Sequence, residues 1–156
     1  GGIKRRLEKR FENESVTIID DIAHSPEKAS VILRDLRTVY GNETKILAIF
    51  EPNIGGRSAE TAVKYTGAFS SADGVIIPRL TKLKIDHTGV LQPMDGKDLS
   101  HIISRSHSNV LYQPNDELLV QDLANLATDK HILIAFLGSH GFRGMIESLI
   151  SKLGKK

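Results

Sequence analysis

The stretch Ile18-Ile19-Asp20-Asp21-Ile22-Ala23-His24-Ser25-Pro26-Glu27 decides how the neighbouring segments can fold. Its first residues are β-branched and predict a strand. Its last residues open a helix, with Ser25 as the N-cap before a proline and an acidic residue. Asp21 and His24 are therefore predicted to lie on a loop between a strand and a helix. In an open α/β sheet, ligands bind at such loops, outside the carboxyl ends of the strands.

The hydrophobic pattern continues as an alternation of strands and helices. Residues 4–20 predict two strands joined by the polar segment 12–15, which suits a hairpin. Beyond them, apolar runs of strand length alternate with stretches that repeat apolar residues at helical spacing. The predicted strands are 45–50, 74–77, 110–112 and 131–137, and the predicted helices are 26–40, 58–71, 97–105, 115–126 and the segment from 142 onward, with 79–96 irregular.

This order predicts a doubly wound α/β fold. We expect a Rossmann-like, mainly parallel sheet with an N-terminal antiparallel hairpin and helices on both faces. The segments 45–50 and 131–137 are almost wholly apolar, as parallel strands covered on both faces are. The chain has 156 residues and no internal repeat or low-complexity linker, so residues 1–156 are predicted to form a single domain.

The composition limits the environments that suit this chain. It contains no cysteine, which excludes a disulfide framework and Cys-based zinc sites and fits a reducing compartment. The longest wholly apolar run, 132–137, is too short to span a bilayer, and the N-terminus lacks the apolar core of a signal peptide. We therefore expect a cytoplasmic protein that does not bind membranes.

Charge and motifs exclude further classes. The net charge is only +2, the basic residues form no stripe and aromatic residues make up 5% of the chain, so nucleic acid is not an expected partner. No P-loop is present, because Gly96-Lys97-Asp98 lacks both the leading glycine and the hydroxyl residue of that motif. The chain is therefore not expected to cradle a triphosphate alone. Four histidines show no spacing typical of metal ligands, so no metal site is predicted: His87, His101, His107 and His131.

Four blocks of sequence resemble those of one enzyme family. The segment Asp21-Ile22-Ala23-His24-Ser25-Pro26 resembles the D-[YF]-[AG]-H-x-P signature of the C-terminal domain of the Mur ligase family, ATP-dependent enzymes that join amino acids or peptides to a cell-wall precursor. Gly2-Ile3-Lys4-Arg5-Arg6-Leu7-Glu8 is similar to the family's opening strand, G-[VI]-x-R-R-x-E. Phe50-Glu51-Pro52 is similar to its [FL]-[QE]-P turn, and Leu137-Gly138-Ser139-His140-Gly141-Phe142-Arg143-Gly144 to its closing glycine-rich loop.

The resemblance implies that this chain is the third, C-terminal domain of a larger ligase of peptidoglycan biosynthesis or recycling. Its partners would be the central ATPase domain and the N-terminal UDP-binding domain of the same protein. ATP and Mg²⁺ would be bound mainly by the central domain, so the isolated domain is expected to be inactive. The enzyme would add alanine or a recycled tripeptide to UDP-N-acetylmuramate through an acyl phosphate. Three blocks resemble the tripeptide-adding type more closely: Arg5-Arg6-Leu7-Glu8, Phe50-Glu51-Pro52 and Gly141-Phe142.

The resemblance also implies roles for nucleotide-binding residues. The family residue that matches Asp21 contacts the ATP ribose, and a carboxylate can accept hydrogen bonds from both ribose hydroxyls. His24 matches a histidine beside the nucleotide. Arg6 matches an arginine that reaches the ATP phosphates as a catalytic residue, where a fixed cation stabilises developing negative charge. The chain departs from the family at Ile22, where an aromatic residue is usual, and at Ser25, where His or Thr is usual.

Two further loops are implied to bind the substrate that supplies the amino group. Glu51, Asn53 and Arg57 match the region that holds the incoming amino acid or peptide, where an arginine can bind a carboxylate bidentately. The alternative is that this loop only connects two elements. Ser139, His140 and Gly141 are predicted to form a turn at the start of the last helix, where backbone N–H groups suit an anion. A tight turn that needs glycine for backbone reasons is the alternative there.

Two alternatives from other classes remain open. One is the same domain in a ligase that acts on folate or on a polymer such as cyanophycin. The other is a Rossmann-type binding module without ligase chemistry, which predicts nucleotide or ligand affinity in the isolated chain. Without the resemblance, Asp20 and Asp21 would be read as residues that cap and solvate a loop.

Overall fold

The computed structural model describes residues 6–81, 93–126 and 130–155. Its centre is a six-stranded sheet with the order β1-β2-β6-β3-β4-β5. β1 is antiparallel to β2, and the other neighbouring strands are parallel to one another. The predicted mainly parallel sheet with an N-terminal hairpin is therefore confirmed. The strands are β1 (Glu8–Glu12), β2 (Val16–Asp21), β3 (Lys45–Glu51), β4 (Gly74–Pro78), β5 (Val110–Gln113) and β6 (Ile132–Gly138).

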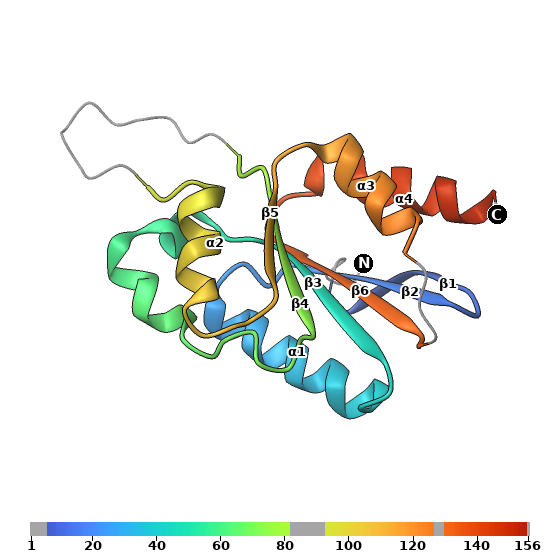
Figure 1. Ribbon diagram of the computed structural model, residues 1–156, viewed down its shortest axis with the longest axis horizontal. Coiled ribbons are helices and arrows are strands. Elements are labelled where there is room, and N and C mark those ends of the chain that lie inside the picture. The colour runs from blue at the N-terminus through green and yellow to red at the C-terminus, as the bar shows by residue number, and fades with distance from the viewer. Residues whose placement is uncertain (1–5, 82–92, 127–129, 156) are drawn as a thin grey trace.

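Helices cover both faces of the sheet, as Figure 1 shows. Helices α1 (Pro26–Tyr40) and α2 (Gly96–Ser104) lie on one side, and α3 (Asp116–Ala124) and α4 (Met145–Gly154) lie on the other. Adjacent residues of β3 divide between the two cores, because side chains alternate along a strand: Phe50 packs with the α1 side and Ile49 with the α4 side. Both faces are therefore buried, which explains the nearly continuous apolar sequence of β3 and β6.

The chain order brings three strand ends together. β6 follows all the other strands in sequence, yet it lies between β2 and β3. In this register Asp21 pairs with Leu137, and Glu51 pairs with Gly138. The chain leaves β2 towards the α1 face and leaves β6 towards the α4 face. This edge is therefore a topological switch point, where α/β proteins bind ligands.

The helix predicted after Asp21 begins and ends as expected. Ser25 caps α1, since its hydroxyl oxygen accepts a hydrogen bond from the Lys28 backbone N–H at 3.2 Å, and Pro26 occupies the first turn. Gly41 ends the helix with a φ of 81°, a conformation that glycine adopts without steric cost. The start of α1 therefore fixes where the loop between Asp21 and Ser25 must lie.

Two helix predictions are wrong in detail. The segment 58–71 does not form an α-helix. One 3₁₀ helix, η1 (Ile54–Arg57), precedes it, and a second, η2 (Ala59–Tyr65), occupies its first half. Ser58 makes no side-chain capping bond, and the Tyr65 hydroxyl donates to the Gly56 carbonyl at 2.7 Å, which folds the segment back on η1. The last helix begins at Met145 rather than directly after Gly141.

The delay of α4 follows from the backbone of the preceding residues. Phe142, Arg143 and Gly144 all have positive φ, at 57°, 53° and 81°, and they form the short η3 (Phe142–Gly144). The residues Ser139, His140 and Gly141 consequently do not lie in the first turn of α4, which corrects the prediction of a helix N-terminus at this turn. Part of the predicted first strand, before Arg6, and the segment 82–92 lie outside the described residues. No helix within residues 6–81, 93–126 and 130–155 has the length and apolar character needed to cross a membrane.

Candidate functional site

The predicted site residues gather at the carboxyl edge of the sheet. Asp21 and Glu51 are the last residues of β2 and β3. Behind the ends of three neighbouring strands come His24 after β2, Asn53 and Arg57 after β3, and Ser139, His140 and Gly141 after β6, while Arg6 precedes β1. The β2 and β3 loops are joined directly, since the Asn53 N–H donates to the His24 carbonyl at 3.0 Å. The predicted site residues therefore lie along one edge of the sheet.

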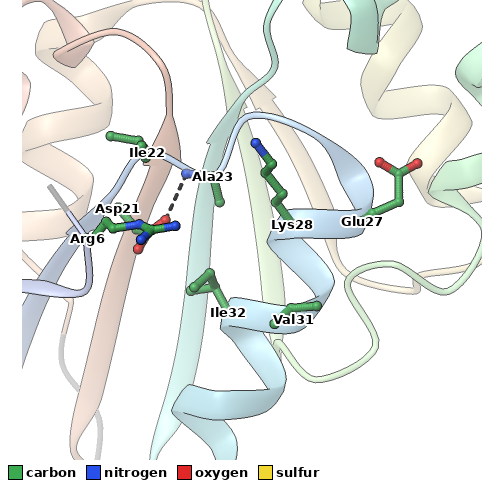
Figure 2. A pocket seen from close by; sticks show the side chains of 8 residues that line it. All are labelled: Arg6, Asp21, Ile22, Ala23, Glu27, Lys28, Val31 and Ile32. Carbon is green, nitrogen blue, oxygen red and sulfur yellow. Dashed lines mark hydrogen bonds between the residues drawn. The ribbon is translucent and has the colours of Figure 1, made fainter. Parts of the chain in front are cut away.

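A pocket of about 320 Å³ opens between the end of β2 and the first turns of α1 (Figure 2). It combines two carboxylates and two cations with an aliphatic wall. Of these residues, Arg6 and Asp21 are predicted site residues and Ile22 is a departure from the family pattern, whereas Lys28 was not predicted from the sequence. The signal that could have found Lys28 is helical spacing, because residues 28, 31 and 32 lie on one face of α1. The lining residues are Arg6, Asp21, Ile22, Ala23, Glu27, Lys28, Val31 and Ile32.

Asp21 lines this pocket although it is only 4% exposed. One carboxylate oxygen, Oδ2, accepts from the Leu7 N–H at 2.7 Å, and the other, Oδ1, accepts from the Ala23 N–H at 2.8 Å, the bond drawn in Figure 2. These bonds tie the start of β1 to the loop after β2. Each carboxylate oxygen can accept a further hydrogen bond, so Asp21 can still serve a ligand in the pocket.

His24 lies beside the pocket rather than in its lining. Its side chain is half-buried, and Nδ1 is buried with no hydrogen-bond partner among the described residues. A buried polar atom without a partner costs about 1–3 kcal/mol. Nδ1 of His24 therefore lacks a hydrogen-bond partner among the described residues, and a ligand bound at this edge of the sheet could supply one.

Glu51 is the most deeply buried of the predicted site residues, with 1% of its surface exposed. Its Oε2 accepts from the backbone N–H and the hydroxyl of Thr81, both at 2.7 Å. Its Oε1 has no hydrogen-bond partner in the described part of the chain. The Arg143 Nη1 lies 3.7 Å from Oε1, close enough for attraction between charges but too far for a hydrogen bond.

Arg57 and Asn53 hold the β3 loop in place. Arg57 is 7% exposed, and its guanidinium donates from Nε to the Met94 carbonyl at 2.8 Å and from Nη1 to the Thr81 carbonyl at 2.7 Å. Burial lowers the pKa of Arg57 below its usual value, and the charge of Glu51 opposes that shift. The Asn53 side chain caps η1 by accepting from the Gly56 N–H at 3.1 Å. Both residues therefore have structural partners in addition to any ligand.

The turn after β6 packs closely against β3. A Cβ atom on Gly138 would lie 2.9 Å from the Glu51 carbonyl oxygen and 3.0 Å from the Phe142 ring, so only glycine fits there. Ser139 is half-buried, and His140 and Gly141 are exposed. The turn therefore requires glycine at Gly138, as the alternative predicted. The reason is the close approach of the β3 backbone to Gly138 and not a positive φ.

An arginine and an aspartate that sequence reasoning did not select lie beside this turn. Arg143 donates to both carboxylate oxygens of Asp116, from Nε at 2.7 Å and from Nη2 at 2.8 Å. Arg79 lies 3.5 Å from the same carboxylate. The hydrogen bonds from Arg143 hold the pKa of Asp116 below its usual value, and the same bonds raise the pKa of Arg143. Arg143 belongs to the glycine-rich block, but no pattern in the sequence predicts its pairing with Asp116.

The donor set of the described residues does not suit a metal ion. Within residues 6–81, 93–126 and 130–155, no group of three or more His, Cys, Asp or Glu side chains could bind one. His87 lies outside the described residues.

The fold is an α/β domain whose pocket beside Asp21 lies at the switch point of a mainly parallel sheet. The chain belongs to the Mur ligase family: the family model described as "Mur ligase, glutamate ligase domain" matches residues 5–140. It is 32% identical over 152 residues to the UDP-N-acetylmuramate–L-alanine ligase of Crocosphaera subtropica, an alignment that covers 96% of this chain and 29% of that protein. The chain thus spans less than a third of the length of this curated relative.

Solved structures share the fold. The UDP-N-acetylmuramate-alanine ligase of Thermotoga maritima superposes with a TM-score of 0.72 at 19% identity, covering 99% of this chain and 31% of that chain. A murein peptide ligase of Psychrobacter arcticus superposes with a TM-score of 0.76 at 18% identity, again over 99% of this chain and 31% of that one. A folylpolyglutamate synthase of Mycobacterium tuberculosis has a TM-score of 0.61 at 18% identity, over 96% of this chain and 32% of that one.

Proposed function

We propose that residues 1–156 form the C-terminal domain of an ATP-dependent ligase that joins an amino acid or a short peptide to UDP-N-acetylmuramate. Membership of the Mur ligase family and the identity to a UDP-N-acetylmuramate–L-alanine ligase support this assignment. The observation that carries it is the carboxyl edge of the sheet, where the pocket beside Asp21 lies at the end of β2 and the loops after β6 and β3 leave the neighbouring strands. One side of this edge suits a nucleotide, and the other suits the incoming amine.

The pocket beside Asp21 suits the nucleoside end of ATP. Its volume, about 320 Å³, falls within the range of about 300–1,000 Å³ typical of small-molecule sites. Asp21 would accept hydrogen bonds from the ribose hydroxyls, and the aliphatic side chains of Ile22 and Ile32 would contact the base in place of an aromatic ring. Arg6 and Lys28 supply positive charge for the phosphates. The unpartnered Nδ1 of His24 supplies one more polar atom at the same edge.

The reaction that this domain would complete is an amide ligation. The γ-phosphoryl group of ATP passes to the muramoyl carboxylate and gives an acyl phosphate and ADP. The amino nitrogen then attacks the acyl carbon, the bond from that carbon to the phosphate oxygen breaks, phosphate leaves and the nitrogen loses a proton. Arg6 would stabilise the negative charge of this intermediate when the domain closes over ATP. Mg²⁺ neutralises ATP charge in such reactions, and its ligands would come from the central domain.

The loops after β3 and β6 would hold the amine. Glu51 offers a buried carboxylate oxygen, and Arg57 and Asn53 keep its loop in position. The backbone around Ser139, His140 and Gly141 lies beside Glu51 because of the pairing of Glu51 with Gly138. In this proposal Arg57 acts mainly through the Thr81 and Met94 carbonyls and leaves the direct substrate contacts to its neighbours.

The assignment is tested with the full-length protein that contains this chain. Purified protein is incubated with ATP and UDP-N-acetylmuramate and, separately, with L-alanine or with L-alanyl-γ-D-glutamyl-meso-diaminopimelate. We expect ADP release that depends on both substrates and an amide product of matching mass. Calorimetry on residues 1–156 should detect negligible ATP affinity. Tight ATP binding by the fragment, without ligation by the full-length protein, would favour a binding module instead.

A folate ligase is the second candidate, because the fold similarity extends to a folylpolyglutamate synthase. The same assay with dihydropteroate or tetrahydrofolate and L-glutamate separates the two. Ligation of glutamate to the folate, with no product from UDP-N-acetylmuramate, would transfer the assignment to that class.

A further inference from the structure

A chain of hydrogen bonds joins the β1–β2 hairpin to the start of β6, at the end of the sheet opposite the pocket beside Asp21. The His131 ring lies at its centre. Nδ1 of this ring lies 3.0 Å from the Glu14 carbonyl oxygen, and Nε2 lies 2.7 Å from the Thr17 hydroxyl oxygen. The same hydroxyl donates to Oε2 of Glu12 at 2.9 Å. One threonine side chain therefore links two segments that are far apart in sequence.

This network is part of the sheet and does not form a catalytic site. A threonine bonded to a histidine has the chemistry of an activated nucleophile. Thr17 is 0% exposed, however, so a substrate has no access to its hydroxyl oxygen. The backbone beside the ring is paired on both sides, because the Ile132 N–H donates to the Ser15 carbonyl at 2.9 Å and the Lys45 N–H donates to the His131 carbonyl at 2.8 Å. The property of the network that can vary is its number of protons.

The acceptors of the network fix where its protons lie. A backbone carbonyl only accepts hydrogen bonds, so Nδ1 of His131 must carry a proton to bond with Glu14. An ionised carboxylate also only accepts, so the single hydroxyl proton of Thr17 points to Glu12. The Thr17 oxygen then accepts from Nε2, which must carry a second proton. A ring that is protonated on both nitrogens is an imidazolium cation.

The charged groups around the ring include one carboxylate that is joined to it through Thr17. Hydrogen bonds from Thr17 and Lys9 lower the pKa of Glu12 below its usual value, so Glu12 is ionised at neutral pH. Asp129 lies outside the described residues. The other charged side chains on the neighbouring segments are Lys9 on β1, Glu14 in the hairpin turn, Lys45 on β3, Lys130, and Asp73, which lines a small cavity with both of the last two lysines.

We propose that His131 is a pH-dependent clamp, which as an imidazolium holds the β1–β2 hairpin against β6 and on losing its Nε2 proton releases Glu12. After that loss Nε2 can only accept, so the Thr17 hydroxyl must turn to donate to it and no longer bonds Glu12. The bond to the Glu14 carbonyl is kept, because Nδ1 retains its proton. One proton thus decides whether Thr17 donates to the hairpin or to the ring.

The clamp makes the stability of the fold depend on pH with a definite sign. The folded chain holds the second ring proton more tightly than the unfolded chain, which releases it near pH 6.5, the usual value for histidine (about 6.5). The contribution to stability is therefore complete below about pH 6 and is lost as the pH rises through the range in which the folded chain releases the proton.

Nuclear magnetic resonance of the histidine ring nitrogens tests the proton count. Residues 1–156 suit the measurement, because helices of this chain cover both faces of the sheet. At about pH 7 we expect both nitrogens of His131 to carry protons, although free histidine is only about one quarter protonated there. His107 is an internal control. Its Nδ1 accepts from the Asn109 N–H and its Nε2 donates to the Ala72 carbonyl, so its ring should hold a single proton.

The variant E12Q separates this network from other causes of protonation. Its amide group can donate to Thr17, which frees the hydroxyl proton for Nε2 of a neutral ring. We therefore expect His131 to lose its second proton at a lower pH in E12Q than in the wild type, with Nδ1 still protonated. The matched control is E14Q, which removes an exposed carboxylate but keeps the backbone carbonyl that the ring contacts, so it should retain both ring protons at about pH 7.

Substitutions of the buried threonine give a second, independent test. T17V has no hydroxyl group, so the ring should lose its second proton at a lower pH, as in E12Q. T17S keeps the hydroxyl and should restore the wild-type behaviour. Glu12 lies at the surface, so E12Q decides the outcome even if T17V folds poorly.

Urea unfolding links the proton to folding. The wild type should unfold at a higher urea concentration than E12Q at about pH 6, and the gap should narrow towards about pH 9. A wild-type His131 ring with a single proton at about pH 7 would overturn the clamp. Loss of the second proton at the same pH in the wild type, E12Q and T17V would also overturn it, as would a stability gap that widens with rising pH.

Discussion

Arg57 and Arg143 are two arginines near the same carboxylate that use their guanidinium groups in different ways. Arg57 is buried and bonded to the carbonyls of two segments that are distant in sequence, around residues 81 and 94. Arg143 is more exposed. Its Nε and Nη2 donate to the Asp116 carboxylate, and its Nη1 makes no hydrogen bond with the described residues. Substitution at Arg57 should therefore affect stability more than substitution at Arg143.

Replacing the buried Arg57 by methionine should lower the free energy of unfolding by about 2–4 kcal/mol, because the backbone carbonyls of Thr81 and Met94 lose charged donors. Urea denaturation followed by circular dichroism measures this change. Arg34, an exposed residue of α1, supplies the control, since R34M should change the free energy by less than about 0.5 kcal/mol. A loss for R57M no larger than that of R34M would remove the structural role assigned to Arg57.

The Asp116 carboxyl makes a stability contribution that depends on pH. Its pKa in the folded protein lies below the unfolded value of about 3.9, because Arg143 donates hydrogen bonds to the charged form. The contribution is therefore complete above about pH 4 and is lost as the pH falls through the folded value. The variant D116N should be less stable than the wild type at pH 7, on the order of 1 kcal/mol, and the difference should shrink towards pH 2–3. Urea unfolding at both pH values measures it, and a difference that is constant with pH would contradict the pairing.

At the scale of elements, the turn between β6 and α4 decides how close the β3 and β6 ends can come. The approach of Gly138 to the Glu51 carbonyl leaves no space for a side chain, whereas Gly141 has open space around its Cβ position and a φ of −81°. The two glycines of one turn are therefore under different constraints.

The substitution G138A should lower the free energy of unfolding by about 1–3 kcal/mol, because the new methyl group must displace the β3 backbone. G141A should change it by less than about 0.5 kcal/mol. Thermal unfolding of both variants, measured in parallel, makes the comparison. If G141A were the more destabilising of the two, the close approach of Gly138 to β3 would not be the constraint on this turn.

Elements with strong local signals were predicted well from the sequence. The strand before Asp21 and the helix capped by Ser25 follow from residues adjacent in the chain, and both are confirmed. The errors lie where contacts between distant residues decide the backbone. Tyr65 folds its segment against Gly56, and the pairing of Arg143 with Asp116 joins residues 27 positions apart. Local patterns carry no information on such pairs, so the 3₁₀ helices, the late start of α4 and the pairing of Arg143 with Asp116 were not predicted.

At the scale of the whole molecule, the two binding regions that we propose lie on opposite faces of the sheet. The pocket beside Asp21 lies on the α1 side, and Glu51 and Arg143 lie on the α4 side. The sheet between them is built from strands buried on both faces, which makes it a rigid support. Substitutions on one side should therefore change one substrate constant and leave the other.

Lys28 tests this separation in the full-length ligase. The variant K28Q should raise the KM for ATP by about threefold to tenfold, because it removes a cation from the pocket, and should leave the KM for L-alanine unchanged. K97Q, on the exposed surface of α2, is the matched control and should change neither constant. Steady-state kinetics with each substrate varied in turn gives both values. Equal increases in both constants for K28Q would argue against two separate regions.

The position of β6 in the middle of the sheet also affects how the domain is made. Because β6 follows every other strand in sequence but lies between β2 and β3, those two strands have no common neighbour until residues 132–138 have left the ribosome. A nascent chain stopped before that point exposes two unpaired strand edges, the surfaces from which aggregation begins. Formation of the sheet thus depends on contacts far apart in sequence, so folding should be slow and completed late in synthesis.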